Sequence, residues 1–437
     1  MLKHLNGNQK NFIKKLKTIL EKRKVKDSDN SILVKKIIRD IKKNKDNSLI
    51  KFEKKFSKIK NLNKSKIKFK KKEIESIIKK LDTRTKKSID LAFQRIYNFH
   101  KKQKYQSFKI KDKYNNHFSY ISSPIDKVGV YVPGGTANYP SSVLMNCIPA
   151  MIAGVKEVYM STPCLSKECK PAVLYAAKKC KVKEIYKVGG AQAIAAFAYG
   201  TNIVKKVDKI VGPGNQFVAL AKKEVFGDVG IDMIAGPSEV TIIADKSCNT
   251  EWVAADLIAQ AEHDKYSQSI LLSSDKKIIK EVIININEQL KNLPKKKIAS
   301  SSLKNFGLAI SVSKKTLLTK LVNIIAPEHL EICTENPEII LKDISNAGSI
   351  FIGHYSPEAV GDYLAGTNHV LPTAGSAKFS SGLSVFDFLK RHSVIKMSKS
   401  GIERLGASVI NLAEYENLKG HSNSVKLRLK KRTKLIG

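Results

Sequence analysis

Two hydrophobic periodicities divide the chain. Up to about residue 118 the sequence is rich in Lys, and its apolar positions recur at helical spacing, as they do across residues 88–101. From Val128 onward, short apolar runs alternate with Gly-rich turns and with helical segments such as Met145–Ala153. A second portion of this kind runs from about Gly236 to Leu383. This alternation predicts an α/β protein with parallel sheets and crossover helices.

The segment from Ile231 to Asp264 carries the clearest local signals. The β-branched run Thr241–Ile243 predicts a buried strand, and Glu251–Glu262 predicts a helix. At the end of that helix, Gln260 and His263 stand three residues apart and share one helix face. An amide oxygen and an imidazole therefore point into the same space.

The tail from Ser384 is polar and largely helical in pattern. Its last segment, residues 424–434, alternates between apolar and basic positions and predicts a strand.

Four further residues carry matching chemistry. Glu328 and His329 are adjacent in an apolar context, where a carboxyl and an imidazole can divide general acid–base work. An isolated Glu-His pair is, however, more often a surface or helix-start feature. Asp362 lies in a Gly-flanked stretch and can serve as a metal ligand, although a lone Asp is more often a cap. His421 by itself is typical of an exposed turn. Together with Gln260 and His263, Asp362 and His421 offer two nitrogens and two oxygens, a set that suits Zn²⁺.

Glycine-rich turns raise the question of a nucleotide cofactor. They occur at Gly134-Gly135, Gly189-Gly190 and residues 212–215, but none forms G-x-G-x-x-G or a P-loop. Dinucleotide binding and tight turns without a ligand are both compatible with this pattern. Three polar residues lie at or just beyond these turns and are placed to contact a cofactor: Tyr131, Gln192 and Asn215.

Composition narrows the function classes. The 437 residues carry a formal net charge of +40, but 71 of the 79 basic residues are Lys and aromatic residues make up 7%. Nucleic-acid recognition favours the Arg fork and stacking aromatics, so we expect no nucleic-acid partner and interpret the Lys as solvated surface. Six cysteines without a CxxC pair fit free thiols in a reducing cytoplasm. No apolar run approaches the ~20 residues of a membrane span, and no membrane association is expected.

The chain resembles histidinol dehydrogenase over nearly its whole length, at least from about Val128 to Val425. The resemblance rests on motifs that stand in the order and spacing of that family. They are VGVYVPGG, VGGAQAIAAFAYG, VGPGN, IDMIAGPSEV…DLIAQAEHD, APEHLE, GDYLAGTNHVLPT and SGLSVFDFLKR.

The resemblance implies an NAD- and zinc-dependent enzyme that oxidises L-histidinol through L-histidinal to L-histidine, at the end of histidine biosynthesis. Glu328 and His329 would then be the acid–base pair. Carried over in the same way, one Zn²⁺ per subunit would be held by Gln260, His263, Asp362 and His421. NAD would face Tyr131, Gln192 and Asn215. The metal ligands and the acid–base pair would also contact the substrate, together with Ser238 and Glu416.

The implied fold is a pair of incomplete Rossmann-like domains with small terminal extensions, in an intertwined homodimer. We expect residues 1–25 to form a helical extension, and residues 26–129 with 239–383 to form the domain that carries the zinc and catalytic residues. Residues 130–238 would form the NAD-side domain. Residues 384–437 would reach the partner subunit, so that His421 and Glu416 enter its active site.

Two alternatives stay open at the level of sequence. The first is a relative that applies the same zinc and NAD chemistry to another small alcohol. The second is a nucleic-acid-binding role driven by the +40 charge, which would show as steeply salt-dependent retention on DNA or RNA.

Overall fold

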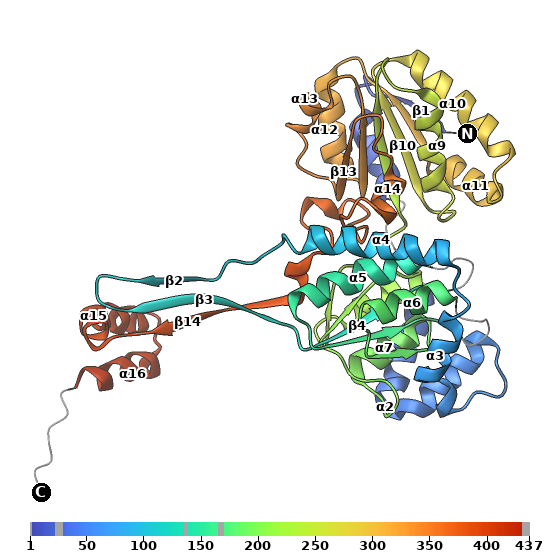
Figure 1. The fold of residues 1–437 in the computed structure, drawn as a ribbon. Coiled ribbons are helices and arrows are strands. Elements are labelled where there is room, and N and C mark those ends of the chain that lie inside the picture. Colours follow the sequence, from blue (N-terminus) through green and yellow to red (C-terminus); the bar gives the residue numbers. More distant parts are fainter. Residues whose placement is uncertain (1, 22–28, 135–138, 165–169, 431–437) are drawn as a thin grey trace, which may run out of the picture. The chain divides into compact units, whose positions relative to one another are not determined.

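The computed structural model describes residues 2–21, 29–134, 139–164 and 170–430. It divides into two units. The first comprises Met1–Gln103 and Ile125–Phe388, and the second comprises Lys104–Pro124 and Leu389–Gly437. Figure 1 shows both units and labels many of their helices and strands.

The first unit contains a six-stranded parallel sheet with the strand order β1-β11-β10-β9-β12-β13. Its strands are β1 (Lys3–Asn6), β9 (Glu239–Ala244), β10 (Gln268–Ser273), β11 (Leu308–Ser311), β12 (His329–Cys333) and β13 (Ser349–Ile352). Its helices are α1 (Phe12–Glu21), α9 (Thr250–Ala261), α10 (Lys276–Lys291), α11 (Lys296–Phe306), α12 (Lys315–Ile325), α13 (Pro337–Leu341) and α14 (Glu358–Tyr363). The expected strand and helix around residues 241 and 251–262 are confirmed as β9 and α9.

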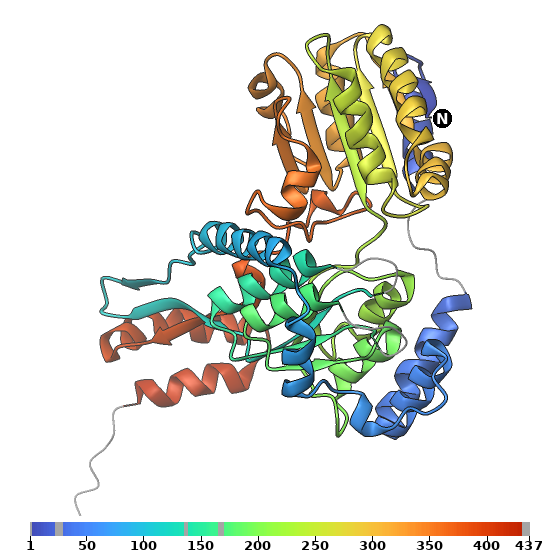
Figure 2. The ribbon, with the colours of Figure 1, turned by 45° about the vertical axis from the view of Figure 1, so that its right-hand side comes forward.

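Both faces of this sheet are covered, which explains why β9 is buried at every position. Val240 and Ile242 of β9 pack into one core with α9, α10 and α11, and Ile243 packs into another with α1 and α12. Figure 2 shows α9, α10 and α11, in yellow-green to yellow, along one face of the sheet. The period-2 alternation of side chains assigns successive residues of the strand to opposite layers.

The first unit also contains a five-stranded parallel sheet, ordered β6-β5-β4-β7-β8. Its strands are β4 (Lys127–Tyr131), β5 (Glu157–Ser161), β6 (Glu184–Tyr186), β7 (Lys209–Val211) and β8 (Gly230–Ile231). Its helices are α2 (Asp29–Ser57), α3 (Lys71–Ile78), α4 (Thr83–His100), α5 (Pro140–Ala153), α6 (Pro171–Lys179), α7 (Gly190–Tyr199) and α8 (Gln216–Val225). Three short 3₁₀ helices, η1 (Lys64–Lys66), η2 (Ser376–Lys378) and η3 (Val385–Phe388), complete the described elements of this unit.

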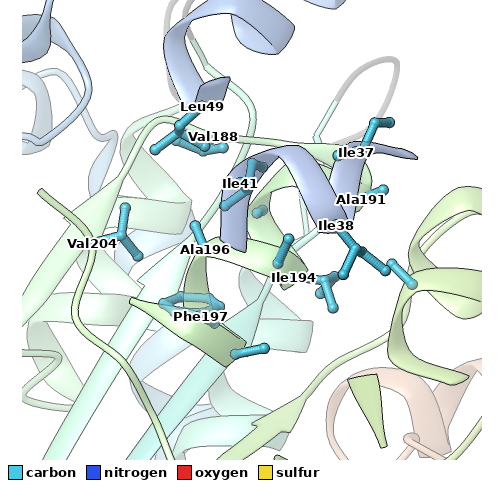
Figure 3. Packing of buried hydrophobic residues seen from close by; sticks show 14 of the residues in the cluster. Ile37, Ile38, Ile41, Leu49, Val188, Ala191, Ile194, Ala196, Phe197 and Val204 are labelled. Carbon is cyan, nitrogen blue, oxygen red and sulfur yellow. The ribbon is translucent and has the colours of Figure 1, made fainter. Parts of the chain in front are cut away.

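The division between the two sheets differs from the expected domain boundaries in two places. Residues 3–6 form β1, which extends the six-stranded sheet beside β11, where a purely helical extension was expected. Helices α2, α3 and α4, expected with the zinc-carrying domain, pack instead against α7, α6 and α5 of the five-stranded sheet. The reason is burial. The apolar face of α2 (Ile37, Ile41) forms one core with Ile194 and Phe197 of α7 (Figure 3).

The second unit is a three-stranded antiparallel sheet with two helices. The strand order is β14-β3-β2, and the elements are β2 (Phe108–Lys111), β3 (His117–Pro124), β14 (Leu389–Lys396), α15 (Lys399–Tyr415) and α16 (Lys419–Leu429).

The strand prediction for residues 424–434 is wrong for the part that the structure describes, because Ser424–Leu429 lies in α16. Residues 431–434 lie outside the described residues. Val425 and Leu429 are four residues apart, so they share a helix face that packs on α15 at Gly406. A Cβ at Gly406 would lie 2.9 Å from Leu429 Cδ1 and 3.1 Å from Val425 Cγ1. The run therefore fits both a strand and a helix, and only the packing of Val425 and Leu429 on α15 decides for the helix.

Across the described parts of the chain, we find no helix that is both long enough and apolar enough to span a bilayer.

Candidate active site

The polar residues singled out by the sequence gather at one edge of the six-stranded sheet. Glu328 immediately precedes β12, and Ser238 immediately precedes β9, its parallel neighbour. Because α9 returns antiparallel to the strands, its carboxyl end, with Gln260 and His263, lies at this same amino-terminal edge. Open α/β sheets more commonly bind ligands at the opposite, carboxyl edge of their strands.

The backbone N–H and carbonyl groups of Glu239 contact both side chains of the expected acid–base pair. Its N–H donates to Glu328 Oε2 at 2.9 Å, and its carbonyl oxygen lies 3.0 Å from His329 Nδ1. Since a carbonyl only accepts, His329 carries its proton on Nδ1 and the lone pair on Nε2. Burial lowers the pKa of His329 to about 4, so the imidazole is neutral at physiological pH. A neutral, oriented imidazole beside a carboxyl group is suited to accept a proton.

Three expected metal ligands come from α14 and from the carboxyl end of α9 with the turn that follows it. Gln260, near the end of α9, is fully buried, whereas His263 just beyond α9 is partly exposed. Asp362, in α14, places Oδ2 4.0 Å from His263 Nε2. His263 and Asp362 form, with Glu358, a group whose potential ligand atoms all lie within 4.8 Å of one another.

Two residues of the cluster were not assigned by the sequence. His369 donates from Nδ1 to the Asp362 carbonyl oxygen at 3.1 Å, and burial lowers its pKa. Glu358 opens α14 and is 3% exposed, and burial raises its pKa well above the usual value. A signal for Glu358 does exist: Glu358 and Asp362 are four residues apart, which puts both carboxyl groups on one helix face.

The expected cofactor contacts form a second cluster at the carboxyl edge of the five-stranded sheet. Tyr131 ends β4, and its hydroxyl accepts from Gly190 N at the start of α7 at 3.1 Å. Gln192, also in α7, donates to Glu53 Oε2 at 2.9 Å. Asn215 caps α8, and its side-chain oxygen accepts from the backbone N–H groups of Phe217 and Val218. Helix amino ends at strand carboxyl ends are where dinucleotide phosphates bind in such sheets.

The turn that leads to Asn215 is held by a buried ion pair. Gly212 has φ +113°, and a Cβ there would lie 2.1 Å from the Tyr131 carbonyl oxygen, so glycine is required. Asp232 accepts from Gly212 N at 2.8 Å, while Lys222 donates to Gly212 O at 3.0 Å and to Asp232. Both charged side chains are buried, which fixes the turn at its amide and at its carbonyl.

The last two expected site residues belong to the second unit. Glu416 follows the final residue of α15, and His421 lies in the first turn of α16. The structure thus brings Gln260, His263, Asp362, Glu328, His329 and Ser238 to one sheet edge, and it places Glu416 and His421 on a separate unit.

Comparison with known proteins gives a consistent result. The family model for histidinol dehydrogenase matches residues 20–429. A histidinol dehydrogenase of Pelagibacter ubique is 54% identical over 99% of this chain and 100% of its own length. One from Clostridium acetobutylicum is 47% identical over 91% of this chain and 92% of its own.

A solved structure agrees with the fold. The crystal structure of histidinol dehydrogenase from Elizabethkingia anophelis superposes with a TM-score of 0.92 at 38% identity, covering 98% of each chain. The matched length, the identity and the shared fold lead to one conclusion: this chain belongs to the histidinol dehydrogenase family and is an oxidoreductase.

Proposed function

We propose that this chain oxidises L-histidinol in two steps, through L-histidinal to L-histidine, with NAD as the electron acceptor and one Zn²⁺ per subunit. The family membership supports the substrate. The observation that carries the chemistry is the position of a neutral His329, adjacent to Glu328, at the sheet edge that also holds Gln260, His263 and Asp362.

The residues present fit a zinc site. The imidazole nitrogen of His263 and a carboxylate oxygen of Asp362 lie 4.0 Å apart, and both are ligand types that Zn²⁺ accepts. The side chain of Gln260 starts from the same end of α9 and offers an amide oxygen. Gln260, His263 and Asp362 would hold the metal, and His421 would supply a second nitrogen. Bound Zn²⁺ would fix the substrate imidazole and amine, so that the alcohol carbon is presented in one pose.

The cluster at the five-stranded sheet fits NAD. Tyr131, Gln192 and Asn215 are each held by hydrogen bonds at a glycine turn or helix start, so the cofactor would meet a preorganised surface. Burial raises the pKa of Tyr131 to about 12, which keeps its hydroxyl neutral and able to donate. NAD would accept the two electrons of each oxidation.

The chain's own residues would divide the proton transfers. His329 Nε2 would take the hydroxyl proton of histidinol in the first oxidation, since Nδ1 is occupied by the Glu239 carbonyl. Glu328 would take a proton from the water that adds to the aldehyde, and His329 would then accept the proton of the resulting diol. Ser238 and Glu416 would contact the substrate.

We further propose a homodimer in which Glu416 and His421 complete the partner's site. The second unit exposes several large apolar side chains, which a partner subunit would cover. They include Phe108, Ile110, Ile395, Leu412 and Leu427. The cysteines in the described part of the chain are free, which supports a cytoplasmic location, and we expect no nucleic-acid or membrane partner.

The first experiment measures NADH formed per L-histidinol consumed by the purified protein, before and after chelation. We expect two NADH per substrate, lost on chelation and restored by Zn²⁺. One NADH with released aldehyde would contradict the assigned second step. No turnover of histidinol by a folded, zinc-loaded dimer would favour another small alcohol as the substrate.

A further inference from the structure

Glu358 is a buried carboxyl group at the active-site edge that the proposed proton transfers do not use. It begins α14, its backbone N–H donates to Glu331 Oε1 at 2.7 Å, and it is 3% exposed. Its Oε1 lies 3.5 Å from His329 Nδ1. A carboxyl group removed from water is costly unless it is hydrogen-bonded, so the partners of Glu358 indicate its role.

The main partner of Glu358 is the side-chain amide of Gln260. One terminal atom of that amide lies 2.9 Å from Glu358 Oε1, 3.2 Å from Glu358 Oε2 and 3.2 Å from the Glu239 carbonyl oxygen. A backbone carbonyl can only accept a hydrogen bond, so this atom must be the nitrogen. The amide oxygen of Gln260 therefore points away from Glu358 and Glu239.

This orientation matters because only the oxygen of an amide side chain is an effective metal ligand. An amide that flipped would present its NH₂ group to the metal and lose one ligand. Groups behind a ligand that fix its rotation typically change metal affinity by about 10- to 100-fold when they are removed. Glu239 provides one of the three contacts of the Gln260 nitrogen, and Glu358 provides the other two, including the shortest.

We propose that Glu358 is a positioning residue that holds the Gln260 amide with its oxygen turned toward the metal site formed with His263 and Asp362. The proposal rests on the proposed function only in requiring that a metal binds there. It competes with direct ligation by Glu358, whose oxygens are also within reach of a shared ion. Both Glu358 oxygens face the Gln260 nitrogen, which favours positioning.

A double-mutant cycle on zinc affinity separates the two roles. The dissociation constant of Zn²⁺ is measured by competition with a chelator for four purified proteins: parent, Glu358→Met, Gln260→Ala and the double variant. Methionine fills the space of the glutamate and accepts only weakly. We expect Glu358→Met to weaken zinc binding about 10- to 100-fold in the parent, and to have no further effect once Gln260 is alanine.

Two variants serve as controls. Glu358→Gln keeps an acceptor oxygen and is expected to bind Zn²⁺ within a few-fold of the parent. Glu338→Ala removes an exposed glutamate from the first turn of α13 and is expected to change nothing. Thermal unfolding of the metal-free proteins checks that each variant is folded. If Glu358→Met does not fold, Glu358→Ala replaces it in the cycle. The zinc affinities of Glu358→Ala and Glu358→Gln are then compared with Gln260 present and with Gln260→Ala.

Equal weakening by Glu358→Met in both backgrounds would show direct ligation and overturn the proposal, as would an unchanged affinity in the parent. The proposed function fails separately: a parent protein that binds Zn²⁺ and shows the expected cycle, but does not oxidise histidinol, would refute the activity and leave the positioning role standing.

Discussion

At the scale of single residues, the candidate site depends on hydrogen-bond donors and acceptors whose roles are unambiguous. The carbonyl of Glu239 fixes the tautomer of His329 because it can only accept, and it identifies the nitrogen of the Gln260 amide for the same reason. One strand residue thus contacts a side chain proposed to move protons and another proposed to hold the metal.

The two members of the proposed acid–base pair have separable effects. We expect His329→Ala to slow both oxidations by about 10²- to 10⁴-fold, because each requires a proton to leave an oxygen. Glu328→Gln is expected to spare the oxidation of histidinol and to slow that of histidinal by a similar factor. Steady-state NADH formation from each substrate measures this. Near-normal production of histidine from added histidinal by Glu328→Gln would refute the role in water activation.

A buried histidine away from the site should make stability depend on pH. His100 in α4 donates from Nδ1 to Ile96 O at 2.9 Å, and its Nε2 faces the amide nitrogen of Asn368 at 3.4 Å. That amide also donates to Met145 O, so it cannot turn to accept from a protonated ring. Burial lowers the pKa of His100, and the unfolded chain therefore binds the extra proton first as the pH falls.

The free energy of unfolding contributed by His100 is therefore fully present above about pH 6.5 and is lost as the pH falls through the window below it. Urea unfolding of the metal-free protein at pH 7 and pH 5.5 measures the loss. We expect His100→Gln to lower stability at pH 7 and to reduce the difference between the two pH values. The exposed His4→Gln is the matched control, and an equal pH effect in parent and His100→Gln would contradict this account.

At the scale of elements, α2 joins the five-stranded sheet through one apolar face. Ile41 is fully buried against the core shared with α7, whereas Ile32 on the same helix is 71% exposed. Figure 3 shows Ile41 among the side chains of that core. The helix is therefore part of the domain that carries the residues proposed to contact NAD.

Removing the side chain of Ile41 from this core should lower the stability of the protein. Ile41→Ala is expected to lower the free energy of unfolding by about 2–5 kcal/mol, because it removes buried methyl groups and leaves a cavity. Ile32→Ala should change it by less than about 0.5 kcal/mol. Denaturant unfolding of both variants tests the assignment, and similar losses for the two would show that α2 does not depend on this face.

At the scale of the whole molecule, the proposed sites need residues from two units of the chain. The described parts give Gln260, His263 and Asp362 to the first unit and Glu416 and His421 to the second. An intertwined dimer would let each second unit complete the site of the other subunit. That arrangement predicts that two inactive subunits can form one working site.

Subunit complementation measures this directly. His421→Ala and His329→Ala carrying different affinity tags are co-expressed, and the mixed dimer is isolated. We expect about half of the parent's activity per dimer. One of the two sites combines the intact His329 of the His421→Ala subunit with the intact His421 of the other subunit, and the second site lacks both. An inactive mixed dimer would place His421 in its own subunit's site, and the mixed dimer of parent and tagged parent is the control. Failure to recover any mixed dimer would contradict the homodimer.

The sequence by itself determined the local features of this protein. Periodicity specified β9 and α9, because these patterns depend on backbone geometry within a few residues. The spacing of Gln260 and His263 predicted one shared helix face, but α9 ends at Ala261 and His263 lies in the turn that follows. The long motifs specified the family.

Only the tertiary structure decided which elements share a core. It assigned α2 to the five-stranded sheet, turned residues 424–429 into a helix that packs on Gly406, and brought Glu358 against Gln260. For an apolar helix face or a carboxyl group, the sequence offers several segments that could serve equally well as the packing or hydrogen-bond partner. The choice among them comes from burial and hydrogen bonding between segments about 20 to 150 residues apart, which no local pattern records.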